Sequence, residues 1–94
     1  MTIRSFKNDE ARAAFEGRLI KGFPADLLRV AQRKLTYLDA AVSIGDLRSP
    51  PGNRLETLKG DRSGQHSIRV NDQFRICFVW SPEGPMDVEF TDYH

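Results

Sequence analysis

The segment Arg48-Ser49-Pro50-Pro51-Gly52-Asn53 divides this chain of 94 residues into two parts with different apolar patterns. Proline lacks a backbone donor and disfavours the helical conformation of the residue before it, so the segment predicts a helix stop followed by an extended connector. Before the segment, apolar residues recur at three- and four-residue spacing, and after it they alternate. Helices followed by strands predict an α+β fold, with the helices on one face of an antiparallel sheet.

The first part predicts two helices that fold back on each other. After a short opening strand at residues 3–6, Asn8 or Asp9 caps a first helix that runs to about Leu19. Pro24 suits the first turn of a second helix, and the apolar stripe of that helix comprises Leu27, Val30 or Ala31, Lys34 or Leu35, and Leu38. Its charged residues are expected mainly on the outside: Asp26, Arg29, Arg33 and Lys34. A third, short helical turn is expected around residues 43–47.

The second part predicts strands at residues 54–59, 65–70, 74–80 and 85–93, joined by turn sequences rich in Gly, Asn, Asp and Pro. Three consecutive hairpins form an antiparallel sheet, and the opening strand can add to one edge. We therefore expect one domain over residues 1–94, with two to three N-terminal helices packed on an antiparallel sheet of four to five strands.

Alternation assigns the sheet residues to two faces. The apolar sets must meet the helices, and they comprise Ile68 and Val70 of one strand and Phe74, Ile76, Phe78 and Trp80 of the next. Arg69 and Arg75 then project from the opposite side, the open face, where two guanidiniums can bind phosphate oxygens bidentately. The alternative is that they only keep this face soluble. Lys59 and Arg62 supply two more cations at a hairpin mouth.

Two residues are expected to be structural. His66 shares the face of Ile68, which predicts a buried, hydrogen-bonded histidine. Cys77 lies in the middle of a strand and is expected to be a small core or sheet residue rather than a nucleophile. As the single cysteine, it excludes an intrachain disulfide and a cysteine-based zinc site.

Charge is distributed unevenly along the chain. Residues 1–75 contain 14 Lys and Arg and 9 Asp and Glu, whereas residues 76–94 contain four acids and no base. A basic body with an acidic final hairpin fits contact with a polyanion on one surface, the alternative being an ordinary solvated face. No apolar run could span a bilayer and no signal peptide is visible, so a cytoplasmic protein is expected. Neither a phosphate-binding glycine loop nor metal-ligand spacing occurs, so no cofactor or metal is expected.

The triplet Asp92-Tyr93-His94 directly follows an alternating apolar pattern, Met86, Val88 and Phe90. His94 and His66 are the only histidines, and His94 is the better candidate for a general acid or base, because imidazole titrates near neutral pH. The alternative is a solvated tail with an incidental histidine.

Four stretches of the chain after residue 53, taken together, resemble a known protein family. They are Arg54-Leu55-Glu56-Thr57-Leu58-Lys59-Gly60-Asp61-Arg62, His66-Ser67-Ile68-Arg69-Val70, Phe74-Arg75-Ile76-Cys77-Phe78 and Asp92-Tyr93-His94. Together they resemble the HigB family of bacterial toxins, which belongs to the RelE-like superfamily. The stretch from Leu47 to Glu56 resembles its GraT-like branch in particular.

The resemblance implies a RelE-like fold and a metal-independent endoribonuclease, a toxin that depends on the ribosome and cuts messenger RNA in the decoding site. It also implies a HigA-like antitoxin with a helix-turn-helix domain, and contacts of basic residues with 16S rRNA. The implied catalytic group comprises Arg75 at the scissile phosphate, Lys59 of the Leu-Lys-Gly motif, and the terminal residues Asp92, Tyr93 and His94. The residues expected to contact RNA are Arg69, Arg62 and Glu56.

One position departs from the family pattern. Other HigB proteins have a histidine three residues before the motif lysine, where this chain has Glu56. Either Glu56 takes part of that role, or activity depends more strongly on His94. The alternative function is a non-catalytic module of the same fold that binds RNA or a partner protein.

Overall fold

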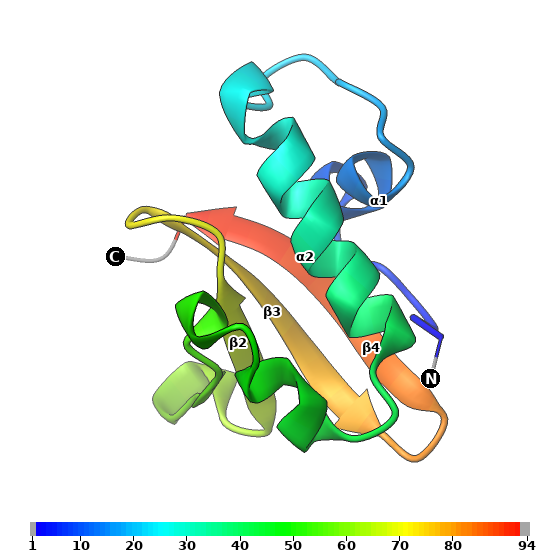
Figure 1. The fold of residues 1–94 in the computed structure, drawn as a ribbon, viewed down its shortest axis with the longest axis vertical. Helices are drawn as coiled ribbons and strands as arrows, with labels where there is room; N and C mark the ends of the chain where they lie inside the picture. Colours follow the sequence, from blue (N-terminus) through cyan, green and yellow to red (C-terminus); the bar gives the residue numbers. More distant parts are fainter. Residues whose placement is uncertain (1, 93–94) are drawn as a thin grey trace.

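The computed structural model describes residues 2–92. Its elements, with η marking a short 3-10 turn, are α1 (Asp9–Phe15), η1 (Ala25–Leu27), α2 (Leu28–Ala40), η2 (Ile44–Arg48), η3 (Pro51–Asn53), β1 (Glu56–Thr57), η4 (Gly60–Arg62), β2 (Gln65–Arg69), β3 (Phe74–Ser81) and β4 (Gly84–Asp92). The four strands form an antiparallel sheet in the order β1-β2-β3-β4, and α1 and α2 lie on one side of it (Figure 1). The predicted α+β fold is therefore confirmed.

The apolar stripe of α2 packs against the centre of the sheet. Leu35 and Leu38 are fully buried, as are Ile76 and Phe78 of β3, and all four belong to one core cluster. Fully burying such a side chain contributes about 1.5–3 kcal/mol. The predicted helix-facing side of the sheet is thus the apolar core.

The prediction that the first helix continues to about Leu19 is wrong. Gly17 has a φ of +74°, a left-handed conformation that glycine adopts at little cost. Its N–H donates to the carbonyl of Ala14 at 3.1 Å, and the N–H of Arg18 donates to the carbonyl of Ala13 at 2.8 Å. These two bonds satisfy the last carbonyls of the helix, which therefore ends earlier, and Leu19 is left 53% exposed.

α2 follows Pro24 through the turn η1, close to the predicted start. Arg29 and Arg33 are exposed as expected, but Lys34 is only 7% exposed, so the prediction that it lies mainly outside is wrong. Its Nζ donates to the Oδ1 of Asn53 at 2.5 Å. A buried ammonium requires such a partner, and this partner comes from a loop beyond the helix. The predicted third helical turn is present as η2.

The predicted connector is extended only at Ser49 and Pro50, and the strand predicted at residues 54–59 is present only as β1. The connector contains the turn η3, and only the two residues of β1 pair with β2. The physical reason is the conformation of Arg54, which follows η3 with a φ of +45°. A left-handed residue departs from the regular conformation of a strand, and here pairing begins two residues later, at Glu56.

The opening segment runs alongside β4 without forming a full strand. Phe6 makes a parallel bridge with Val88, and the N–H of Lys7 donates to the carbonyl of Val88 at 2.8 Å. Asn8 caps α1 through Oδ1 and also bonds Phe90, whose carbonyl accepts from Nδ2 at 2.8 Å and whose N–H donates to Oδ1 at 3.3 Å. The expected addition at a sheet edge is therefore present as a hydrogen-bonded segment.

A bulge in β4 overturns one part of the predicted alternation. The pairing register shifts between Cys77 and Val79, and Asp87 has a φ of +52°. The extra residue inverts the alternation, so Met86 pairs with Val79 on the open face. The prediction that Met86 shares a side with Val88 is wrong.

Candidate active site on the open face of the sheet

Arg75 projects from β3 onto the open face, as the alternation predicts, and its guanidinium is held at two nitrogens. Nε donates to the Oγ of Ser67 at 2.7 Å, and Nη2 donates to the carbonyl of Arg54 at 2.7 Å. Ser67 is fully buried on β2, which fixes the first acceptor. The guanidinium is therefore pre-oriented, and a pre-oriented cation can stabilise developing phosphate charge without reorganising.

Arg69 of β2 is the direct cross-strand partner of Arg75. Like charges at such positions are unfavourable, but Arg69 forms an ion pair with Asp72 of the following turn. The structure thus brings the two predicted guanidiniums together on one face. Arg75 donates to oxygens of Ser67 and Arg54, and Arg69 pairs with the carboxylate of Asp72.

Arg62 comes from the turn η4 and pairs with Glu89 of β4. Its Nη1 lies 2.9 Å from Glu89 Oε1 and 3.1 Å from Gln65 Oε1, and the paired side chains are 29% and 18% exposed. Glu89 lies opposite Cys77, which is fully buried. Burial raises the pKa of the Cys77 thiol, which keeps it protonated and unreactive. This agrees with the predicted structural role.

Glu56 and Lys59 lie at the β1 edge of the sheet. Glu56 is exposed and pairs in register with Ser67, so it shares the face on which Ser67 holds Arg75. Lys59 is exposed and lines a shallow pocket together with Glu56. The predicted residues Lys59 and Glu56 therefore lie near each other at the β1 edge of the sheet.

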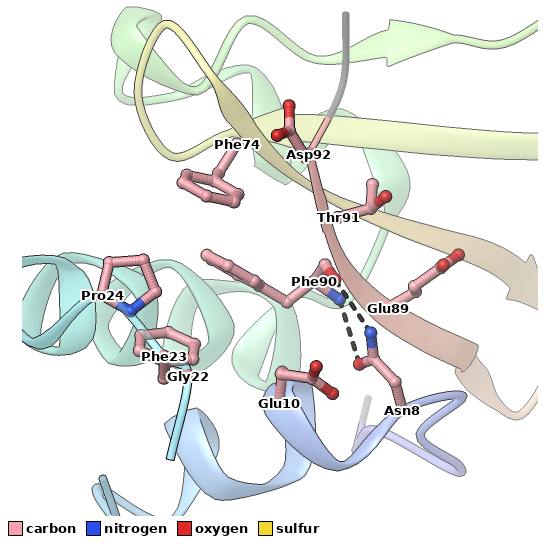
Figure 2. A pocket seen from close by; sticks show the side chains of 10 residues that line it. All are labelled: Asn8, Glu10, Gly22, Phe23, Pro24, Phe74, Glu89, Phe90, Thr91 and Asp92. Atoms are coloured by element: carbon pink, nitrogen blue, oxygen red, sulfur yellow. Dashed lines mark hydrogen bonds between the residues drawn. The ribbon is translucent and has the colours of Figure 1, made fainter. Parts of the chain in front are cut away.

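Asp92 occupies a different side of β4. It pairs in register with Phe74, whereas the neighbouring Thr91 pairs with Arg75. Figure 2 shows Asp92 beside Phe74 at a pocket with an aromatic floor that includes Phe90, and Thr91 pointing the other way. Gln73 Nε2 donates to Asp92 Oδ2 at 2.9 Å. The other two members of the predicted terminal group, Tyr93 and His94, lie outside the described residues.

His66 lies on the helix-facing side as predicted, but it is half-buried, so the prediction that it is buried is wrong. Its ring lies 6.0 Å from that of Phe78, and its Nδ1 is 3.2 Å from the Oγ1 of Thr57. Burial lowers the pKa of His66, so the neutral ring is favoured in the folded protein.

Three contributors to the site were not predicted from the sequence. Ser67 could have been found as a small polar residue that alternates with Ile68 beside Arg75. Glu89 could have been found by alternation, because it lies between the core residues Val88 and Phe90 and therefore points to the open face. The role of the Arg54 carbonyl could not be predicted from the sequence. Every residue has a main-chain carbonyl, and only the backbone conformation decides which one faces Arg75.

Over residues 2–92, no cluster of three or more His, Cys, Asp or Glu side chains is placed to bind a metal ion. Over the same residues, no helix is both long and apolar enough to span a membrane.

The fold and this face define an α+β protein with an apolar side under helices and an opposite side that carries Arg62, Arg69 and Arg75. Residues 4–94 match the family model described as the RelE-like toxin of the type II toxin-antitoxin system HigB. The chain therefore belongs to the HigB-like family of toxins of type II toxin-antitoxin systems.

Two curated relatives agree with this family. The toxin HigB-1 of Vibrio cholerae serotype O1 is 51% identical over 78 residues, which cover 83% of this chain and 75% of the relative. The endoribonuclease HigB of Proteus vulgaris is 34% identical over 92 residues, which cover 98% of this chain and 99% of the relative. The second alignment spans almost the full length of both proteins.

Proposed function

We propose that this toxin is a ribosome-dependent endoribonuclease that cuts messenger RNA in the decoding site and so inhibits translation. The observation that carries the proposal is the guanidinium of Arg75, held by Ser67 and by the carbonyl of Arg54 on the open face. Support also comes from the full-length similarity to a relative named as an endoribonuclease.

The proposed reaction needs no metal ion. A base removes the proton of a ribose 2′-hydroxyl, the oxygen attacks the adjacent phosphorus, and an acid protonates the departing 5′-oxygen. Arg75, with Lys59 and Arg69 beside it, would stabilise the charge on the phosphate. His94 is the first candidate for the proton transfers, because imidazole as a chemical group titrates near neutral pH and each transfer is worth about 10²–10⁴-fold. Asp92 and Tyr93 are the other members of the terminal group. Glu56 is the second candidate for proton transfer.

The partners follow from the family. A toxin of a type II system has a protein antitoxin, and we propose a HigA-like antitoxin with a helix-turn-helix domain. On the ribosome, Arg62 and other basic residues would contact the phosphates of 16S rRNA, which position a ligand without reading its sequence.

The main test replaces Arg75. Arg75→Ala should lower ribosome-dependent cleavage by about 10²-fold or more, because one pre-oriented electrostatic group typically contributes that much, and growth arrest should disappear. Arg75→Lys should restore part of the activity, since the charge remains but the planar fork is lost. Arg29→Ala, which removes an exposed arginine of α2, is the matched control and should cleave normally.

Cleavage of programmed ribosomes, cleavage of naked RNA and antitoxin binding are measured for each variant. Full cleavage by Arg75→Ala at unchanged folding would overturn the assignment of this residue. Comparable cutting of naked RNA would contradict ribosome dependence. A wild-type protein that binds its antitoxin and RNA but cuts neither substrate would identify the non-catalytic alternative.

A second test removes His94. Its deletion should lower cleavage by roughly 10²-fold if it is the general acid or base, with a change in unfolding free energy within about 0.5 kcal/mol, as for a surface substitution. Glu56→Ala is measured in parallel. If the deletion cleaves at the wild-type rate and Glu56→Ala does not, the proton-transfer role belongs to Glu56.

A further inference from the structure

A buried polar cluster joins α2 to the loop that precedes β1. Asn53 is fully buried and Lys34 is 7% exposed, and the Lys34 ammonium donates to Asn53 Oδ1 at 2.5 Å. The amide nitrogen of Asn53 donates to the carbonyls of Leu47 and Ser49 at 3.1 and 3.2 Å. The three bonds use both ends of one amide, so Asn53 holds the helix and two points of the loop together.

Stability alone does not explain a lysine at this position. Burial and the nearby charges of Arg33 and Arg69 lower the pKa of Lys34, which shows that the ammonium is disfavoured there. An apolar side chain of similar volume would often serve packing equally well or better. Buried hydrogen-bonded groups, in contrast, specify one geometry, and this cluster specifies the geometry of residues 47–53.

The geometry of residues 47–53 affects Arg75 through the backbone of Arg54. Arg54 follows Asn53 in the chain with a φ of +45°, and its N–H donates to the carbonyl of Pro51 at 3.1 Å. A left-handed backbone at a residue other than glycine persists only where its surroundings enforce it. The carbonyl of Arg54 accepts from Arg75 Nη2 at 2.7 Å, so the placement of the loop sets the acceptor for the guanidinium.

We propose that Asn53, anchored by Lys34, is a positioning residue that acts through Arg54 to orient Arg75. The inference rests on the proposed function and deepens it, because it explains how one edge of the phosphate-binding group is fixed. Ser67 fixes Nε from inside the sheet, and the Lys34–Asn53 pair fixes the acceptor for Nη2 from α2. If the loop shifts, Arg75 keeps its charge, but its guanidinium is no longer held in one orientation.

The test compares Asn53→Ala with Asp39→Ala. Asp39 lies on the same helix and accepts a hydrogen bond from the Ile3 N–H at 2.9 Å, a contact remote in sequence from the loop. Asn53→Ala should lower ribosome-dependent cleavage by about 10- to 10²-fold in the folded protein, because small misplacements of a catalytic group have effects of that size. Asp39→Ala should cleave normally. A wild-type cleavage rate in folded Asn53→Ala would overturn the proposal.

Nuclear magnetic resonance of the arginine side chains supplies a readout that a merely structural role would not move. In the wild type, the Nη2 protons of Arg75 should give separate, slowly averaging signals, and in Asn53→Ala these should merge as rotation becomes free. Asp39→Ala should keep them separate. If the wild-type signals already average as fast as those of exposed Arg29, the guanidinium is not held and the proposal is wrong, whether or not any variant folds.

A double substitution separates this proposal from the proposed function. In an Arg75→Lys background, where the fork is absent, adding Asn53→Ala should change cleavage by less than about twofold, since coupled residues are not additive. If adding Asn53→Ala lowers cleavage as much as it does in the wild-type background, Asn53 does not act through Arg75. If Arg75→Ala itself cleaves normally, the proposed function fails, while the resonance test still decides whether Asn53 positions Arg75. Lys34→Met, expected to cause a smaller loss in the same direction, replaces Asn53→Ala if that variant does not fold.

Discussion

The two faces of the sheet are equally closed to solvent at their centres, but by different means. On the helix-facing side, Ile68 and Phe78 are fully buried beneath the apolar residues of α2. On the open face, Ser67 and Cys77 are also fully buried. On this face Arg75 donates a hydrogen bond to Ser67, and Cys77 lies opposite Glu89, the ion-pair partner of Arg62.

The difference shows how one sheet can be both a scaffold and a reactive surface. Apolar packing is non-directional and tolerates exchange of side chains of similar volume. Hydrogen bonds and ion pairs require each atom at a defined distance and angle. The helix-facing side therefore supplies the free energy of folding, and the open face holds charged groups in fixed orientations. Substitutions on the two sides should have different signatures.

The largest stability effect is expected on the helix-facing side. Phe78→Ala removes a fully buried ring and should lower the free energy of unfolding by about 3–5 kcal/mol, through lost burial and the cavity left behind. Val42→Ala, at a residue that is 72% exposed, is the control and should change it by less than about 0.5 kcal/mol. Urea titration measures both, and a loss below about 1 kcal/mol for Phe78→Ala would contradict the assignment of the core.

An intermediate effect is expected for the ion pair on the open face. Arg62→Ala should cost about 1.5–3 kcal/mol, because it leaves the half-buried carboxylate of Glu89 without a charged partner. It should also make the Cys77 thiol react faster with a thiol reagent. Arg18→Ala breaks a well-exposed pair with Glu16 and should cost less than about 1 kcal/mol. If both variants lower the free energy of unfolding by the same amount, partial burial does not strengthen the Arg62–Glu89 ion pair.

The smallest effect is expected from His66, through the pH dependence of stability. Its pKa is lowered in the folded protein by burial, so the unfolded chain binds a proton first as the pH falls. The contribution of His66 to stability should be constant above the unfolded pKa of about 6.5 and should decrease as the pH falls from there toward the folded pKa. His66→Gln should show a shallower decrease when Tm is measured from pH 8 to pH 5. An identical profile would exclude His66 as a contributor.

The sequence was sufficient for the layers of the fold and for the face of each predicted arginine. Apolar spacing depends on local geometry, so it placed Leu35 and Leu38 under the sheet and Arg69 and Arg75 away from it. These inferences require only the period of a helix or a strand. They do not require knowledge of which segments meet.

The errors arose where distant segments meet or where backbone conformation breaks the period. Lys34 is buried because a loop residue 19 positions later accepts its hydrogen bond. At the bulge, the N–H of Asp87 donates to the Oγ of Ser5, 82 positions earlier, and the bulge changes the face of Met86. Arg54 contributes a carbonyl through a left-handed backbone that no local pattern marks. Contacts of this kind depend on the folded arrangement as a whole.

The two edges of the sheet have a consequence for self-association. The outer edge of β4 is occupied by the opening segment, in which the Arg4 N–H donates to the Pro85 carbonyl at 2.7 Å and the Ser5 carbonyl accepts from the Val88 N–H at 3.1 Å. The opposite edge is β1, only two residues long. Long unpaired edges are the templates on which other strands add and aggregates grow. Within residues 2–92 this sheet offers such a template over β1 alone, so the addition of a strand from a second copy has little edge to start from.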